Sequence, residues 1–132
     1  MRLEGRVVRG KQLGRTLGYP TANIEAEVSP AELSENGVYA AWFELDGRRL
    51  PCVLNQGRHP TVPEGPPTIE AHILDFTGDI YGRRAAVEYL RFLRPERRFP
   101  SLEALKAQID ADGRAARAYF AGLADQTGEE RP

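Results

Sequence analysis

The chain has 132 residues, the length of a single domain with one hydrophobic core. Its 18 basic and 19 acidic residues give a formal net charge of -1, which argues against a protein that coats nucleic acid. The single cysteine, Cys52, excludes an intrachain disulfide and a zinc site made of cysteines. The N-terminal segment lacks the apolar core of a signal peptide, and no apolar run could span a bilayer. We therefore expect a soluble cytoplasmic protein with no membrane partner.

The first half of the chain predicts strands. Residues Leu3 to Val8 carry β-branched side chains and form the first predicted strand. Thr21 to Ile24 is predicted to begin a second strand. Val38 to Leu45 and Arg48 to Asn55 are expected to pair as a hairpin, because the dipeptide Asp46-Gly47 between them favours a tight turn.

The connection between the first two predicted strands is rich in glycine and carries positive charge. Gly10, Gly14 and Gly18 allow backbone amides to approach an anion, and Arg15 adds a charged donor. A phosphate-binding flap and an ordinary glycine-rich turn both fit this pattern. A Walker-type P-loop does not fit, because Arg15 replaces the lysine of that motif and Pro20 blocks the helix that would have to follow.

Thr21 and Asn23 stand two residues apart on an extended segment and therefore share one face. Their neutral oxygens suit a hard cation such as Mg²⁺, which takes its other ligands from water and substrate phosphates. The alternative is that both side chains only cap the turn.

The stretch TIEAHILDF predicts a strand with one apolar face and one polar face. Glu70 and His72 share the polar side with Leu74, opposite Ile69, Ala71 and Ile73. Glu70 is the best candidate for a general base, although a solvated strand face also explains it. His72 could contact a nucleotide or fill the mouth of a barrel. Asp75 and Asp79 flank the following turn as candidate caps.

The last third of the chain predicts one strand and one helix. Ala85 to Leu93 is hydrophobic enough for a largely buried strand. From Ser101, a candidate N-cap, apolar residues follow helical spacing: Leu102, Leu105, Ile109, Ala116, Tyr119 and Leu123. Gly113 weakens the pattern, and we expect the polar tail from Asp125 to Pro132 to be frayed. About six short strands followed by a helix indicate a small antiparallel barrel with a helix packed on it, a mainly β (α+β) fold.

The segment LRPERRF joins the last strand to the helix and holds three arginines and one aromatic ring. Guanidinium planes and a phenyl ring are good surfaces for a flat heteroaromatic ligand. The alternative is a charged connector with Phe99 inserted into the core.

Taken together, these stretches resemble the riboflavin kinase family, in particular the kinase module of bacterial bifunctional riboflavin kinase/FMN adenylyltransferases. Each motif is weak alone, but their order and spacing are specific. The matching stretches are GRVVRG (5–10), GRTLGYPTAN (14–23), GVYA (37–40), NQGRHPT (55–61), IEAHILDFTGDIYG (69–82) and LRPERRFPSLEALKAQIDAD (93–112).

The resemblance implies a six-stranded Greek-key barrel with a C-terminal helix, which transfers the γ-phosphate of ATP to the 5′-hydroxyl of riboflavin to give FMN and ADP. It implies that Glu70 is the catalytic base and that Thr21 and Asn23 contact the nucleotide phosphates and Mg²⁺ or another divalent cation. The other implied ATP-site residues are Gly10, Gly14, Arg15, Gly18, Ile73, Asp75 and Tyr81. The implied flavin-site residues are Arg94, Arg97, Phe99 and Ala104.

The sequence also departs from the family. Gln56 and His59 replace an apolar residue and an arginine, so the packing of that loop is expected to differ. Residues 1–125 are expected to form the kinase domain and 126–132 the tail. No nucleotidyltransferase motif is present, so we expect no FAD synthesis by this chain, although an FMN adenylyltransferase domain could accompany it in a longer parent chain.

Two other functional classes fit the sequence less well. A non-catalytic flavin- or nucleotide-binding barrel would not need the intact Glu70 and PTAN motif. A nucleic-acid-binding barrel of the OB type is disfavoured by the charge of -1 and by the lack of a clear stacking platform on the strands.

Overall fold

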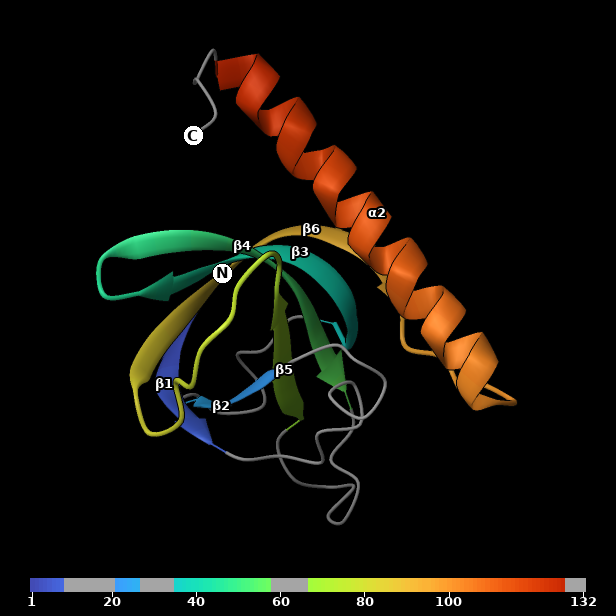
Figure 1. Ribbon diagram of the computed structural model, residues 1–132, viewed down its shortest axis with the longest axis horizontal. Coiled ribbons are helices and arrows are strands. Elements are labelled where there is room, and N and C mark those ends of the chain that lie inside the picture. The colour runs from blue at the N-terminus through green and yellow to red at the C-terminus, as the bar shows by residue number, and fades with distance from the viewer. Residues whose placement is uncertain (9–20, 27–34, 58–66, 128–132) are drawn as a thin grey trace.

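The computed structural model describes residues 1–8, 21–26, 35–57 and 67–127 (Figure 1). The predicted flap residues Gly10, Gly14, Arg15 and Gly18 lie outside these ranges, as does His59.

Six antiparallel strands close into a barrel, and one long helix lies across its outside (Figure 1). The elements are β1 (Arg2–Val8), β2 (Ala22–Ala26), β3 (Gly37–Leu45), β4 (Arg48–Gly57), β5 (Thr68–Ile73), β6 (Arg84–Pro95) and α2 (Leu102–Thr127). Around the barrel the order is β1-β2-β5-β4-β3-β6. The pairs β2–β5 and β3–β6 join strands that are distant in sequence, as in a Greek key. This confirms the predicted fold class.

The barrel interior is filled by alternate residues of every strand, as the two-residue period of a strand requires. Phe43, Leu54 and Val87 have no exposed surface, and Ile69 and Ala71 of β5 are buried beside them. Full burial of a large apolar side chain contributes about 1.5–3 kcal/mol, so this interior is the main source of stability.

The close approach of β1 to β2 depends on a glycine. Gly5 pairs with Ala26, and a Cβ atom built on Gly5 would lie 2.1 Å from the backbone oxygen of Glu25. Any side chain at this position would push the two strands apart.

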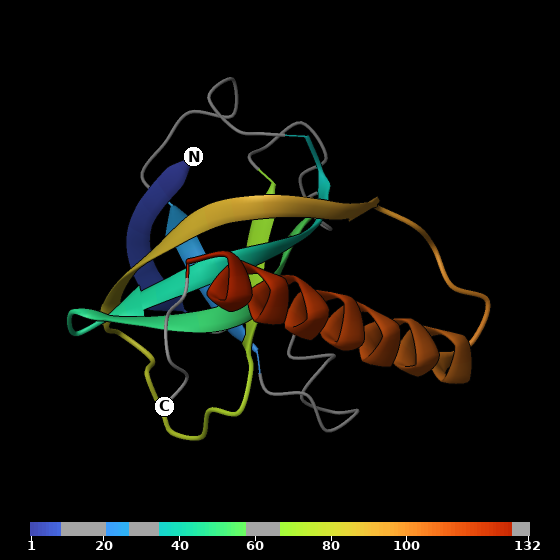
Figure 2. The same cartoon turned by 90° about the horizontal axis from the view of Figure 1, so that it is seen from above.

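Helix α2 covers the outer side of the sheet along β3, β4 and β6 (Figure 2). The predicted N-cap is confirmed, because the Ser101 hydroxyl accepts a hydrogen bond from the Ala104 amide at 3.1 Å. Ala116 is buried in a second cluster with Ala40 and Leu74. Phe120 adds a ring contact, with its centroid 4.8 Å from that of Trp42.

The helix continues through Gly113, where the sequence pattern was weakened, and ends at Thr127. One sequence prediction about the helix is corrected. Leu102 is 59% exposed and is not part of the buried face, because it occupies the first turn of the helix.

The prediction of a largely buried last strand holds only for the start of β6. Ala85, Ala86 and Val87 are buried, whereas Arg91 and Phe92 are exposed. The pairing of β6 with β3 shifts register twice, between Val38 and Tyr39 and again between Ala40 and Ala41. Such irregularities bend a strand, so the second half of β6 does not follow the simple inside and outside alternation.

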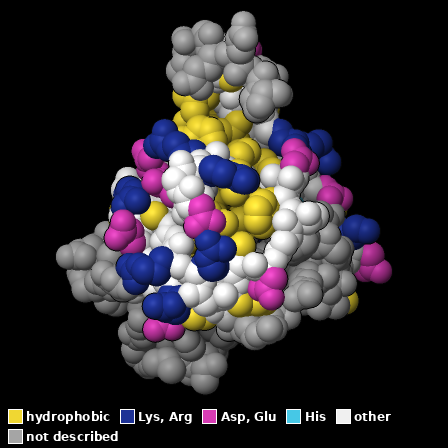
Figure 3. All heavy atoms as spheres, turned by 60° about the vertical axis from the view of Figure 1, so that its left-hand side comes forward, with side chains coloured by type: hydrophobic (Ala, Val, Ile, Leu, Met, Phe, Trp, Pro, Cys, Tyr) yellow, Lys and Arg dark blue, Asp and Glu magenta, His cyan; other side chains and the backbone are white. Residues whose placement is uncertain are grey.

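Charged groups of both signs are interspersed on the surface, and on the face in Figure 3 they surround an apolar patch. Arg2, for example, forms ion pairs with Glu4 and Glu44, and Arg49 pairs with Glu88. Such exposed pairs contribute little to stability individually. No helix in the described part of the chain has the length and hydrophobicity needed to cross a membrane.

Candidate functional site

Glu70 lies in the middle of a row of polar residues that crosses three strands. Its Cα partners are Asn23 on β2 and Asn55 on β4. Neighbouring strands are about 4.8 Å apart, so the three side chains stand side by side. Because Ile69 and Ala71 fill the interior, the row faces outward, as the sequence predicted for Glu70. The sequence did not indicate Asn55 as a site residue, because only the pairing of β4 with β5 places it beside Glu70.

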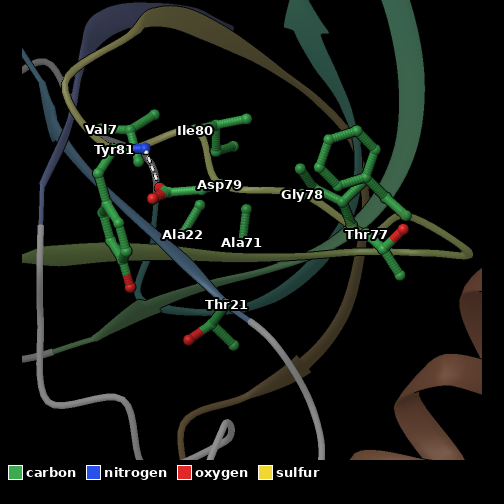
Figure 4. Close-up of a pocket in the computed structure, with 11 residues that line it drawn as sticks. Val7, Thr21, Ala22, Ala71, Thr77, Gly78, Asp79, Ile80 and Tyr81 are labelled. Atoms are coloured by element: carbon green, nitrogen blue, oxygen red, sulfur yellow. Dashed lines mark hydrogen bonds between the residues drawn. The ribbon is translucent and has the colours of Figure 1, made fainter.

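A cavity of about 410 Å³ opens at one end of the barrel (Figure 4). Its lining comes from Val7, Thr21, Ala22, Ala71, Ile73 and residues 76–81. Ile73 and Tyr81, both predicted for the nucleotide pocket, therefore lie together. Within the 76–81 segment, the Asp79 carboxylate accepts a hydrogen bond from the Tyr81 amide at 3.0 Å and so fixes the turn.

Asp75, the third residue predicted for that pocket, is not among the residues that line it. Its carboxylate accepts two hydrogen bonds from Arg117 of α2, at 2.8 and 2.9 Å. The Arg117 guanidinium holds the pKa of Asp75 below its usual value. The chain turns sharply after β5, since Leu74 is buried under the helix and Asp75 has a left-handed φ of 54°. Asp79 is the acidic residue of the cavity instead.

A second cavity of about 210 Å³ lies between the outer face of the sheet, the 94–99 connection and α2. Glu70, His72 and Asn55 line it from the strands. The rest of its lining is Thr21, Val38, Val53, Arg94, Glu96, Arg97, Phe99, Leu105, Ile109 and Asp112.

The predicted flavin residues Arg94, Arg97 and Phe99 are thus brought together with Glu70. Phe99 belongs to neither buried core cluster, and the guanidinium carbons of Arg94 and Arg97 lie 5.7 and 5.2 Å from its ring centroid. Ala104 is not part of the lining, and its neighbour Leu105 takes that place.

Thr21 lines both cavities and joins them. Its hydroxyl oxygen is buried and has no hydrogen-bond partner among the residues that the structure describes. A buried polar atom without a partner costs about 1–3 kcal/mol, which a ligand could recover. Asn23 lines neither cavity, but it stands beside Glu70 in the row. No cluster of three or more His, Cys, Asp or Glu side chains suited to a metal occurs among the described residues.

His72 is half-buried on the wall of the second cavity. Burial, together with the nearby positive charge of Arg117, lowers the pKa of His72, although Asp75 opposes this shift. The imidazole is therefore neutral at pH 7 and can both donate and accept a hydrogen bond.

Comparison with known proteins agrees with this geometry. The family model described as riboflavin kinase matches residues 1–120. The chain belongs to the riboflavin kinase family. Relatives of this chain include proteins named bifunctional riboflavin kinase/FMN adenylyltransferase. The protein from Pseudomonas fluorescens is 47% identical over 121 residues, covering 91% of this chain and 38% of its own length. That from Escherichia coli K12 is 45% identical, covering 89% and 37%.

Solved structures share the fold of this riboflavin kinase domain. The riboflavin kinase from Trypanosoma brucei superposes with a TM-score of 0.67 at 27% identity, covering 91% of this chain and 79% of that one. A Streptococcus pneumoniae structure named a macrolide-efflux protein gives a TM-score of 0.80 at 32% identity, with 88% of this chain but 38% of the other covered. The chain thus spans a little over a third of the length of the bifunctional relatives.

Proposed function

We propose that this chain is a cytoplasmic, ATP-dependent riboflavin kinase that phosphorylates the 5′-hydroxyl of riboflavin and releases FMN and ADP. The observation that carries the proposal is the junction of two cavities at Thr21, because the second cavity contains Glu70. A phosphoryl group that moves from one bound substrate to another requires two adjoining pockets and a base beside the acceptor.

The larger cavity is assigned to the nucleotide. Ile73 and Tyr81 provide an apolar wall and an aromatic wall for the heterocyclic base of the nucleotide. The turn fixed by Asp79 forms one side of this cavity. The smaller cavity is assigned to the flavin, whose flat ring suits the aromatic face of Phe99 and the guanidinium plane of Arg97. With the two substrates so placed, the acceptor hydroxyl points toward Glu70.

The oxygens near the junction fit a divalent cation. Thr21 contributes a buried hydroxyl that has no partner within residues 1–8, 21–26, 35–57 and 67–127, and Asn23 lies on the same strand segment. Thr21 and Asn23 would hold Mg²⁺ or another divalent cation, which neutralises phosphate charge when bound. Two neutral oxygens leave most ligand positions to water and phosphate, as magnesium prefers.

Glu70 accepts the proton of the riboflavin 5′-hydroxyl as its oxygen forms a bond to the γ-phosphorus and the bond from that phosphorus to the ADP oxygen breaks. Asn23 and Asn55 flank Glu70 and restrict the carboxylate to the middle of the row. The chain mainly positions reactants, since phosphoryl transfer through a loose transition state depends on alignment and charge neutralisation.

The relatives combine two activities in one longer chain. An FMN adenylyltransferase domain in a longer parent chain is therefore the partner that we propose for this domain, and it would consume the FMN made here.

The test is incubation with riboflavin, ATP and Mg²⁺, followed by chromatography for FMN. We expect Glu70→Gln to lower kcat by about 100-fold or more while the circular dichroism spectrum is unchanged. Glu4→Gln is the matched control, since Glu4 is exposed on β1, pairs with Arg2 of the same strand and lines neither cavity. Wild-type turnover by Glu70→Gln would contradict the role of Glu70. Binding of flavin and ADP without FMN formation would favour a non-catalytic binding module.

A further inference from the structure

The strongest ion pair between the helix and the barrel joins Arg94 to Asp112. Arg94 Nε and Nη2 each donate a hydrogen bond of 2.8 Å, to the two carboxylate oxygens of Asp112. The two side chains are only 17% and 8% exposed. Bidentate geometry and low exposure make this pair stronger and more rigid than the ion pairs on the surface.

Further hydrogen bonds hold both members of this pair. Arg94 Nη1 donates to the backbone oxygen of Pro95 at 3.1 Å. Gln108, one helical turn before Asp112, donates from Nε2 to Asp112 Oδ1 at 2.9 Å. Three hydrogen bonds, to the Asp112 carboxylate and the Pro95 oxygen, therefore hold the guanidinium and leave it little freedom to reorient toward a ligand.

The same helical turn also reaches the second guanidinium of the cavity wall. Gln108 Oε1 accepts a hydrogen bond from Arg97 Nη1 at 3.3 Å. The guanidinium carbons of Arg94 and Arg97 lie 5.7 and 5.2 Å from the Phe99 ring centroid. One turn of α2 thus fixes two cations around a single aromatic ring on the wall of the smaller cavity.

We propose that Asp112 is a positioning residue for the acceptor substrate. Through the Arg94 guanidinium it fixes the Phe99 ring in the orientation that stacks with the flat ring system of a flavin. This inference rests on the proposed function. It assigns Arg94 a part in shaping the pocket wall, because each of its three nitrogens already donates a hydrogen bond within the protein. It also makes α2 a component of the flavin site.

A second ion pair offers a matched comparison. Arg117 and Asp75 also join α2 to the barrel with two hydrogen bonds, but their side chains are 52% and 76% exposed. Neither residue lines the flavin cavity. Disrupting this pair changes the attachment of the helix without changing the surroundings of Phe99.

The experiment measures the dissociation constants of riboflavin, from the quenching of its fluorescence, and of Mg·ADP, by calorimetry, for the complete chain. For Asp112→Asn we expect riboflavin binding to weaken by about tenfold or more, and Mg·ADP binding to change by less than about twofold. The KM for riboflavin should rise by a similar factor, with a smaller change in kcat. Arg117→Lys removes the bidentate contacts with Asp75 but keeps the positive charge near His72, and it should leave riboflavin binding unchanged.

A double-mutant cycle separates positioning from simple stabilisation. If Asp112 acts through Arg94, the double variant Arg94→Gln/Asp112→Asn should bind riboflavin no more weakly than Arg94→Gln alone. Urea midpoints measured on the same variants show any loss of stability independently. Unchanged riboflavin binding by Asp112→Asn, or additive losses in the cycle, would overturn this inference and leave the proposed function intact. Absence of riboflavin binding by the wild type would overturn it together with the proposed function.

Discussion

At the scale of single residues, Gln56 is a polar side chain in the buried part of the barrel. The side chain has no exposed surface, yet it is polar. Gln56 Oε1 accepts a hydrogen bond from the Tyr89 hydroxyl at 2.7 Å, and its Nε2 donates to Asn36 Oδ1 at 3.1 Å. Because buried polar groups are tolerated when they are hydrogen-bonded, the glutamine cross-links β4, β6 and the start of β3.

We expect Gln56→Leu to lower the free energy of unfolding by about 1–3 kcal/mol, although leucine is the more hydrophobic residue. The physical reason is that the buried Tyr89 hydroxyl would lose its acceptor. Urea denaturation measures this change. The double variant Gln56→Leu/Tyr89→Phe removes both partners of that hydrogen bond and should lose less than the sum of the two single variants. Strict additivity would show that the bond contributes nothing.

At the scale of elements, the length of α2 exceeds what its sequence suggested. The helix has 26 residues and includes Gly113 and Gly122. A Cβ atom at either glycine would meet no other atom within 4 Å. The glycines are therefore not required by packing, and the helix persists because its apolar face is anchored on the sheet.

Gly113→Ala should raise the free energy of unfolding by about 0.5–1 kcal/mol, because alanine loses less backbone entropy in a helix than glycine. Gly122→Ala is the control at an equally open position, and the two gains should add. Thermal unfolding followed by circular dichroism gives both values. A destabilised Gly113→Ala would mean that this glycine serves a ligand or a conformational change.

Which contacts could be predicted depends on how far apart in the sequence the interacting residues lie. Local signals gave correct results: the Asp46-Gly47 hairpin, the Ser101 cap and the outward direction of Glu70. The pairing of Glu70 with Asn55 and of Arg94 with Asp112 joins segments that are distant in sequence, and no local pattern specifies it. The burial of β6 was overestimated for the same reason, since its two bulges, at Leu90 and Leu93, appear only in its pairing with β3.

At the scale of the whole molecule, the only cysteine reports on the integrity of the barrel. Cys52 is completely buried on β4, between Ala41 of β3 and Ile73 of β5. Burial raises the pKa of its thiol, and since the thiolate is the reactive form, the folded chain should not react. Labelling requires the barrel to open, so its rate measures the population of open molecules.

We therefore expect a thiol reagent to label native Cys52 slowly, and saturating ligand to slow the labelling further. A ligand at about 100 times its dissociation constant stabilises the folded state by about 2.7 kcal/mol, which corresponds to about 100-fold slower labelling. Mg·ADP and FMN should each have this effect if the two cavities hold them. Arg48→Cys in a Cys52→Ala background is the control, because position 48 is exposed at the end of a hairpin and should react quickly whether or not ligand is present. Labelling of Cys52 that is slowed by Mg·ADP but not by FMN would place only the nucleotide on the barrel and would contradict the assignment of the smaller cavity to the flavin.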